Sequence, residues 1–212
     1  MIYPYTQVLN SQARGSGVFA TRFIPKGTIV WVLSAVDRLF SIEQVAAMSP
    51  KEREDFGQVA CLINEGVYLL SEDDTRFINH SCNANSLTVN GIEISLAIRD
   101  IQADEEITED YGLYYANGGF GDCLCGSANC RRKICQDDIQ QYGDKWDRQI
   151  EAVFPSIPQV EQPLWDAIAP ARREQIETIL AGKSPLPSCK SLKCSPEQLQ
   201  QAAEYLWPAF NE

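Results

Sequence analysis

Apolar residues in the first half of the chain fall in short runs and alternations that are typical of β-strands. Residues 28–33 are a β-branched apolar run after the turn-forming Pro25-Lys26-Gly27, which predicts a short strand. Residues 92–99 alternate apolar and polar positions, which predicts a strand with one buried face. Asn90-Gly91, just before it, is typical of a tight hairpin that pairs this strand with residues 87–89.

A helical pattern interrupts this β-rich region. Ser41 is followed three residues later by Gln44, the spacing of a capping box at a helix start. Ser49-Pro50-Lys51-Glu52 is a second helix start. We therefore expect a helical insertion at about residues 38–62.

Beyond residue 136 the apolar positions follow a helical spacing. Residues 136–153 are polar and compatible with a helix. Between 162 and 182 the apolar residues recur at helical spacing, and Gly182 is typical of a helix end. A last helix is expected to start at Ser195-Pro196-Glu197. Residues 136–212 are thus predicted to be an α-helical appendage that packs on the β-rich part or recruits a substrate.

Composition and charge narrow the class of protein. The chain has 212 residues, of which 44% are hydrophobic and 22% charged, as in folded globular proteins. Its longest apolar runs fall short of the roughly 20 residues that a membrane helix needs. The N-terminal residues lack the basic and then apolar order of a secretory signal. We expect an intracellular protein, cytoplasmic in a bacterium and cytoplasmic or nuclear in a eukaryote, without membrane binding.

The net charge of −11 lies mostly in the N-terminal half, where residues 1–118 hold 8 Lys and Arg against 16 Asp and Glu. An acidic surface disfavours direct nucleic-acid binding and favours a basic partner. The alternative is that the acidity serves only solubility. The oligomeric state is left open by the sequence.

Eight cysteines are many for a protein in a reducing compartment, where clustered cysteines bind metal more often than they form disulfides. Cys123, Cys125 and Cys130 lie close enough together to bind one tetrahedral zinc ion, which requires a fourth ligand. Cys135 could supply it locally, or Cys82 from across the fold. The alternative is a group of reduced cysteines without metal. Cys189 and Cys194, which have no visible partner pair, are predicted to be free thiols.

Three further segments carry candidate chemistry. Residues 76–85 contain the only histidine, His80, which by itself is more often structural than catalytic. A Ser-His-Asp or Cys-His hydrolase could use only this histidine, which disfavours that class. Residues 105–112 are an acidic turn that leads into Tyr111, and residues 14–19 contain a single G-x-G, a weak signal without a third glycine.

Taken together, the order and spacing of these motifs are more specific than any one of them. In chain order they are R-G-S-G-V-F (14–19), Y-L-L-S (68–71), R-F-I-N-H-S-C (76–82), R-D-I-Q-A-D-E-E-I-T-E-D-Y-G (99–112) and C-L-C-G-S-A-N-C (123–130). Over about residues 14–131 the chain resembles a SET-domain protein lysine methyltransferase with a post-SET zinc-binding loop. The resemblance implies a mainly β fold of small sheets around a pseudoknot with helical insertions. It also implies three parts: a catalytic domain (1–118), a zinc-stapled loop (119–135) and the α-helical C-terminal appendage (136–212).

The resemblance further implies roles for individual residues. The cofactor would be S-adenosylmethionine, and Tyr111 would be the catalytic residue. The cofactor-binding residues would be Gly15, Ser16, Gly17, Val18, Asn79, His80, Tyr111, Tyr115 and Leu124. Tyr68 and Glu109 would line the channel for the target lysine. The zinc ligands would be Cys82, Cys123, Cys125 and Cys130.

Two positions depart from the family pattern. Ala84 stands where the family usually has proline, and Glu109 stands where it commonly has phenylalanine or tyrosine. A carboxylate at 109 could hold a water, pair with the incoming ammonium or face solvent, which leaves the degree of methylation open. The expected function is methylation of a lysine on a basic protein, such as a histone-like or ribosomal protein. The alternatives are a catalytically weak SET-fold module that binds a peptide or the cofactor, and a structural zinc protein of another fold.

Overall fold

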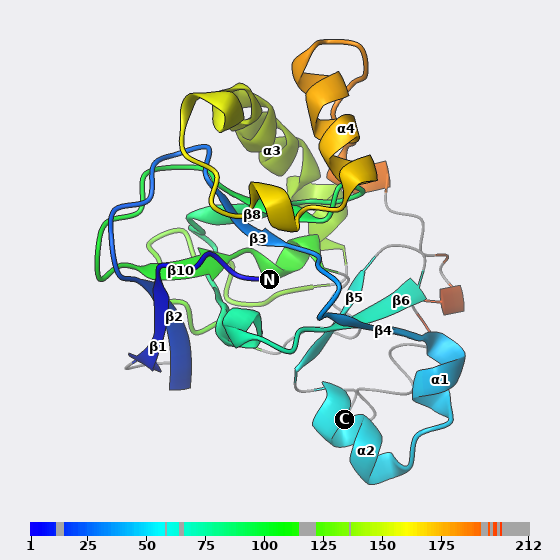
Figure 1. Ribbon diagram of the computed structural model, residues 1–212. Helices are drawn as coiled ribbons and strands as arrows, with labels where there is room; N and C mark the ends of the chain where they lie inside the picture. The colour runs from blue at the N-terminus through cyan, green and yellow to red at the C-terminus, as the bar shows by residue number, and fades with distance from the viewer. Residues whose placement is uncertain are drawn as a thin grey trace.

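The structure is a computed structural model that describes residues 1–11, 15–57, 59–63, 66–114, 122–135, 137–191, 195, 197–198 and 200. Three small sheets form the β-rich part of this described region (Figure 1). The first has the strand order β1 (Thr6–Ser11), β2 (Gly15–Ala20), β10 (Glu106–Glu109) and β7 (Asn79–His80). The second has the order β3 (Ile29–Val32), β9 (Ile94–Ala97) and β8 (Ser86–Val89). The third has the order β4 (Arg38–Ser41), β6 (Val67–Leu70) and β5 (Ala60–Ile63).

The predicted strands of the second sheet are present, with one correction. Strands β8 and β9 form the expected antiparallel hairpin, in which Val89 pairs with Ile94. The prediction of one buried face is wrong, because all four residues of β9 are buried, including the polar Ser95. The Ser95 hydroxyl shares a hydrogen bond of 2.9 Å with Thr88 on β8. A polar side chain in an alternating pattern can therefore mark a paired hydroxyl inside the fold rather than a solvent-facing side.

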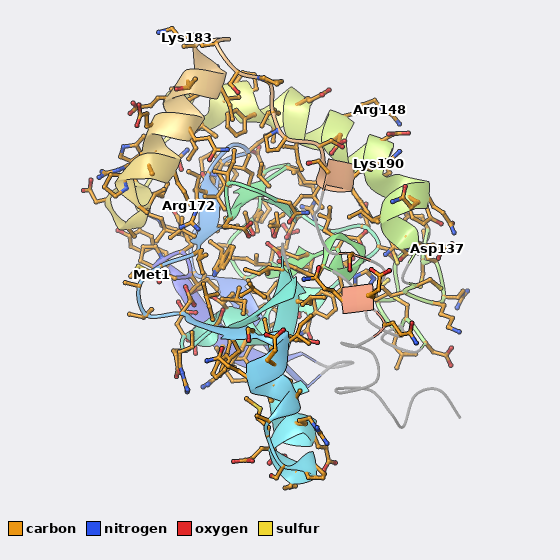
Figure 2. All side chains as sticks on the ribbon, turned by 90° about the vertical axis from the view of Figure 1, so that its right-hand side faces the viewer. Met1, Asp137, Arg148, Arg172, Lys183 and Lys190 are labelled. Carbon is orange, nitrogen blue, oxygen red and sulfur yellow. The ribbon has the colours of Figure 1, made fainter. Side chains whose placement is uncertain are left out.

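The helical insertion begins where the capping residues predict. Helix α1 (Ile42–Ala46) has Ser41 as its N-cap, and the reciprocal bonds between Ser41 and Gln44 complete a capping box. Helix α2 (Pro50–Gly57) follows the equivalent bonds between Ser49 and Glu52. Both helices extend away from the main body, at the bottom of Figure 2. They cover the third sheet, with which they share a small apolar core.

The helices after residue 137 complete the largest core. Helix α3 (Asp138–Val153) and helix α4 (Pro170–Leu180) lie on one side of the second sheet (Figure 1). Trp146 and Ile150 of α3 and Ile176 of α4 are buried in one cluster with the apolar residues of β3, β8 and β9. Outside this core, Arg148 and Asp137 mark the exposed side of α3 in Figure 2.

The continuous helix expected between residues 162 and 182 is interrupted. A short 3₁₀ turn, η5 (Trp165–Ala167), comes first, and α4 begins at Pro170. Ala169 is extended, with φ −54° and ψ 139°, because a proline disfavours helical geometry in the residue before it. Gly182 ends the run as predicted, with φ 69°. The helix expected after Ser195 lies mostly outside the described residues.

In the described part of the chain, four other 3₁₀ turns connect these elements: η2 (Asp74–Phe77), η3 (Tyr111–Leu113), η4 (Phe154–Gln159) and η6 (Cys189–Ser191). Within the described ranges, every helix is too short or too polar to cross a membrane. The mainly β fold with helical insertions is thus confirmed.

Candidate active site and metal centre

Strand β10 brings the separate sequence motifs into one sheet. On one side it pairs antiparallel with β2, where Ile107 lies opposite Val18. On the other side it pairs parallel with β7, where Thr108 lies opposite Asn79 and Glu109 opposite His80. The G-x-G segment, the N-H segment and the acidic segment therefore lie side by side, although about 90 residues separate the first from the last.

Gly17 lies next to the side chains of Asn79 and Glu106. The Asn79 amide donates to the Ser16 carbonyl at 3.0 Å and to Glu106 Oε1 at 2.7 Å. A Cβ atom at Gly17 would displace the Glu106 carboxylate and press on the Asn79 amide, so a larger residue here would disturb the hydrogen bond between these two side chains. The sequence interpretation missed Glu106, although it belongs to the same acidic motif as Tyr111.

The other predicted cofactor residues differ in exposure. Gly15 and Ser16 are exposed, with Gly15 at φ 75°. Val18 is fully buried in an apolar core, so only its backbone is available to a ligand. The Leu124 side chain is 71% exposed. Tyr115 lies outside the described residues.

Tyr111 is held at both ends. Its backbone N–H donates to Nδ1 of His80 at 3.1 Å, and its hydroxyl donates to the Ile78 carbonyl at 2.5 Å. The ring therefore bridges the end of β10 and the segment that leads into β7.

A cavity of about 310 Å³ lies between the third sheet and the end of β10. Tyr111 and Glu109 both line it, as do residues that sequence interpretation missed: Trp31, Cys61, Ser71, Arg76 and Tyr114. Ser71 and Arg76 belong to quoted motifs and Tyr114 follows one, so the motifs were the signal that could have found them, whereas Trp31 and Cys61 lie far from any motif. Tyr68, predicted for the channel wall, does not line this cavity; it is buried against Phe56, with ring centroids 5.8 Å apart.

Glu109 is the buried carboxylate of this cavity, with 2% of its surface exposed. Its Oε2 accepts hydrogen bonds from Thr88, at 3.1 Å, and from the Tyr114 hydroxyl. Burial raises the pKa of Glu109 to about 7, and the neighbouring hydroxyls of Ser95, Thr88 and Ser86 oppose that rise. A solvent-facing position for Glu109, one of the three readings left open by the sequence, is therefore excluded.

On the opposite side of Tyr111, Asp110 forms a buried ion pair. Arg131 donates two hydrogen bonds to the two oxygens of Asp110, each at 2.6 Å, and both side chains are less than 10% exposed. Asp110 also accepts the Gly112 N–H at 3.1 Å, which caps η3. Since Arg131 follows Cys130 in sequence, this pair ties the cysteine-rich loop to the turn that carries Tyr111.

The cysteines form the candidate metal centre. His80, Cys82, Cys123 and Cys125 place their ligand atoms within 4.8 Å of one another. The Cys82 and Cys123 sulfurs are 3.7 Å apart, and two thiolates at about 2.3 Å from one tetrahedral zinc would be about 3.8 Å apart. Cys130 adjoins this group, with its thiol 3.5 Å from the Cys123 carbonyl oxygen. The backbone N–H groups of Arg131 and Arg132 donate to the sulfurs of Cys82 and Cys130, each at 3.3 Å.

Cys135 belongs to a different group, with Asp137 and Asp138. Of the two fourth ligands considered from the sequence, the structure thus brings Cys82, not Cys135, to Cys123 and Cys125. Cys189 is buried, with its thiol 3.5 Å from the Gly143 carbonyl oxygen; Cys194 lies outside the described residues, so the free state of this pair stays a prediction.

His80 supports the metal centre by a hydrogen bond. Its Nδ1 accepts the Tyr111 N–H, so the neutral ring carries its proton on Nε2. That nitrogen lies 3.2 Å from the Cys82 sulfur, and it therefore donates to this sulfur instead of binding a metal. The one histidine of the chain thus connects Tyr111 with the cysteine cluster.

Comparison with known families agrees with this geometry. A family model described as SET domain matches residues 15–112. This part of the chain is a SET domain. It runs from the start of β2 to the turn that contains Tyr111, so it includes the cavity residues Glu109 and Tyr111.

Curated relatives extend the similarity beyond the SET domain. Histone-lysine N-methyltransferase SET9 of Gibberella zeae is 31% identical over 177 residues, which is 82% of this chain and 24% of that protein. Histone-lysine N-methyltransferase NSD3 of Mus musculus is 30% identical over 61% of this chain and 10% of that protein. Histone-lysine N-methyltransferase Set2 of Drosophila melanogaster is 29% identical over 68% of this chain and 7% of that protein. The chain spans a quarter or less of the length of these relatives.

Proposed function

We propose that this chain transfers a methyl group from S-adenosylmethionine to a lysine side chain of a protein. The observation that carries the proposal is the position of Tyr111. It lies in a SET domain, at the wall of a cavity that is large enough for a lysine side chain, and in the turn that follows β10, the strand that pairs with the G-x-G and N-H segments. The three relatives described above are named histone-lysine N-methyltransferases.

The cofactor would bind along β2 and β7. The exposed backbone at Gly15 and Ser16 can approach a ligand closely. Asn79 is fixed beside them by its bonds to Ser16 and Glu106, and the exposed Leu124 is available to cover an apolar ligand surface. When bound, S-adenosylmethionine supplies an electrophilic methyl group on a sulfonium.

The cavity residues would prepare the lysine. Methyl transfer to nitrogen requires a neutral amine, a straight approach and a site from which water is excluded. The Tyr111 hydroxyl, fixed on the Ile78 carbonyl, would orient the amine at the end of the cavity. Apolar walls from Trp31, Leu69 and Ile78 would exclude water from the lysine stem.

The cysteine cluster would hold one structural zinc ion through Cys82, Cys123, Cys125 and Cys130. The 3.7 Å sulfur separation and the backbone N–H groups directed at two of the sulfurs support this assignment. Zinc at this place would fix the loop that carries Arg131, and through Asp110 the turn that carries Tyr111.

The substrate would be a basic intracellular protein, histone-like or ribosomal. The excess of acidic residues in 1–118 supports a basic partner. The proposal predicts transfer of labelled methyl from S-adenosylmethionine to lysine in a panel of core histones and ribosomal proteins, read by mass spectrometry.

The Tyr111→Phe variant tests the catalytic assignment. It should lower methyl transfer at least about 100-fold, because positioning groups act mainly in the transition state. It should cost only about 1 kcal/mol of folding stability, the net value of one hydrogen bond. Tyr5→Phe, at an exposed tyrosine outside the cavity, is the matched control and should keep full activity.

Two results would contradict the proposal in different ways. Cofactor binding without any methyl transfer by the unaltered chain would select the binding module. Zinc binding without affinity for S-adenosylmethionine would select a structural zinc protein.

A further inference from the structure

One oxygen of the buried Glu109 carboxylate is without a partner. Oε2 accepts from Thr88 and Tyr114, whereas Oε1 is inaccessible to solvent and has no hydrogen-bond partner among the described residues. An unpaired buried carboxylate oxygen is costly. Glu109 lines the cavity, so a donor that enters this cavity would satisfy Oε1 once the carboxylate turns this buried oxygen toward it.

The hydroxyl groups around Glu109 hold the carboxylate in place. Thr88 donates to Oε2 and can therefore only accept from Ser95, whose hydroxyl oxygen is 2.9 Å away. The Tyr114 hydroxyl oxygen lies 2.8 Å from that of Thr88 and donates to the same Oε2. Thr88 and Ser95 lie on paired strands of the second sheet. The carboxylate is therefore fixed on its Oε2 side by a rigid element.

The charged and titratable groups that face Glu109 come from several elements. Cys61 on β5, Arg76 on η2, Tyr111 on η3 and Tyr114 after it line the same cavity, and His80 on β7 is its strand neighbour. Among the described residues that line the cavity, Arg76 is the one cation, and it is exposed. The ion pairs found among the described residues do not include Glu109. Its natural partner is thus a cation that enters from outside.

We infer that Glu109 binds the ammonium group of the target lysine through Oε1 and accepts its proton. This rests on the proposed function and goes beyond it, because it assigns the step that makes the amine reactive. The N–H bond of the ammonium breaks, and its proton forms an O–H bond on Oε1. The freed lone pair on nitrogen then forms the bond to the methyl carbon as the carbon–sulfur bond breaks, and that electron pair stays on sulfur, now neutral. The positive charge ends on the methylated nitrogen.

The acidity of Glu109 suits this step. Burial raises its pKa from an ordinary 4.5 to about 7, which brings it closer to the lysine value of roughly 10.4. A base whose pKa lies near the working pH is both available and strong enough to accept a proton. The same dry cavity also lowers the pKa of an entering lysine.

The first test is a pH profile of kcat/KM for the zinc-loaded full chain with whichever of the core histones or ribosomal proteins it methylates. The unaltered chain should gain activity with rising pH through about 7. Glu109→Gln keeps the shape and the hydrogen bonds from Thr88 and Tyr114 but loses the base. It should fall about 100-fold at pH 7 and less than about 10-fold at pH 9.5, where lysine loses its proton to water more readily. Glu105→Gln, at a half-buried glutamate paired with Arg99 outside the cavity, is the matched control and should stay within about 3-fold at both pH values.

The second test needs no methyl transfer. Carboxyl-¹³C glutamate labelling, with the Glu109 signal assigned by its loss in Glu109→Gln, gives the titration of this group directly. Ethylammonium chloride, a mimic of the lysine head, should lower the Glu109 pKa by at least about half a unit, because a bound cation favours the carboxylate.

The two tests separate the inference from the proposed function. A Glu109→Gln profile parallel to that of the unaltered chain would overturn the inference while methylation stands. A Glu109 signal indifferent to ethylammonium would also overturn it. A response to ethylammonium in a chain that methylates nothing would keep Glu109 as an ammonium site and reject the methyltransferase.

Discussion

Glu109 and Asp110 are neighbouring buried carboxylates on opposite sides of the end of β10, and their surroundings differ in kind. Asp110 faces the cysteine-rich loop, where Arg131 pairs with both of its oxygens. Glu109 faces the cavity, where hydroxyl groups donate to Oε2 and Oε1 has no hydrogen-bond partner among the described residues. A buried charge that is fully paired stabilises a connection between two segments, whereas one that is half paired is available for chemistry.

The cysteine side should show the largest effect. Cys82→Ser should reduce bound zinc from about one per chain to near zero, because the loss of one of four thiolates removes most of the affinity of a structural site. Cys135→Ser should leave the zinc content unchanged, since Cys135 belongs to a different group. Metal analysis by mass spectrometry measures both. The reverse ranking would mean that the local four-cysteine site is the true one.

The ion pair at Asp110 comes next. Arg131→Met should lower the free energy of unfolding by roughly 3–5 kcal/mol, because it leaves Asp110 as an uncompensated buried charge. Arg148→Met, on the exposed side of α3 (Figure 2), should change it by less than about 0.5 kcal/mol. Urea denaturation followed by circular dichroism checks both. Equal stability of the two variants would show that Arg131 and Asp110 are not a structural connection.

Substitution of Glu109 should have the smallest effect on the free energy of unfolding. Unlike the substitution of Arg131, it should stabilise the fold at high pH. The folded pKa of Glu109, about 7, lies above its unfolded value near 4.5, so the folded chain holds a proton that the unfolded chain releases between these pH values. Stability should therefore fall as pH rises from about 4.5 to about 7, by roughly 3 kcal/mol at most. Glu109→Gln, which has no such charge to bury, should lose this dependence and be the more stable protein at pH 8.

Urea midpoints at pH 5 and pH 8 measure this difference between the two chains. If the stability of the unaltered chain and of Glu109→Gln depended on pH in the same way, the titrating group would be a residue other than Glu109. The contrast between Glu109 and Asp110 would then fail. A pH dependence in the unaltered chain alone would show that ionisation of Glu109 lowers the free energy of unfolding.

Local features of the fold could be predicted because neighbours in sequence decide them. The Ser41 capping box, the hairpin at Asn90-Gly91 and the helix end at Gly182 each depend on contacts within a few residues. The break at Pro170 was missed, although proline is a local signal, because the apolar spacing continued through it. The spacing of Cys123, Cys125 and Cys130 also predicted a metal site from local sequence alone.

By itself, the sequence determined the strands of the second sheet, most helices, the cysteine loop and the motifs of a SET domain, since short-range geometry and residue type are enough for these. Only the tertiary structure decided that Cys82 and not Cys135 meets the loop, that Tyr68 lies in a small core while Tyr114 reaches the cavity, and that Glu109 is buried. Each of these depends on strand pairing between segments tens of residues apart. The burial and partners of a side chain, which set its chemistry, are properties of the packed fold around it and not of its sequence neighbours.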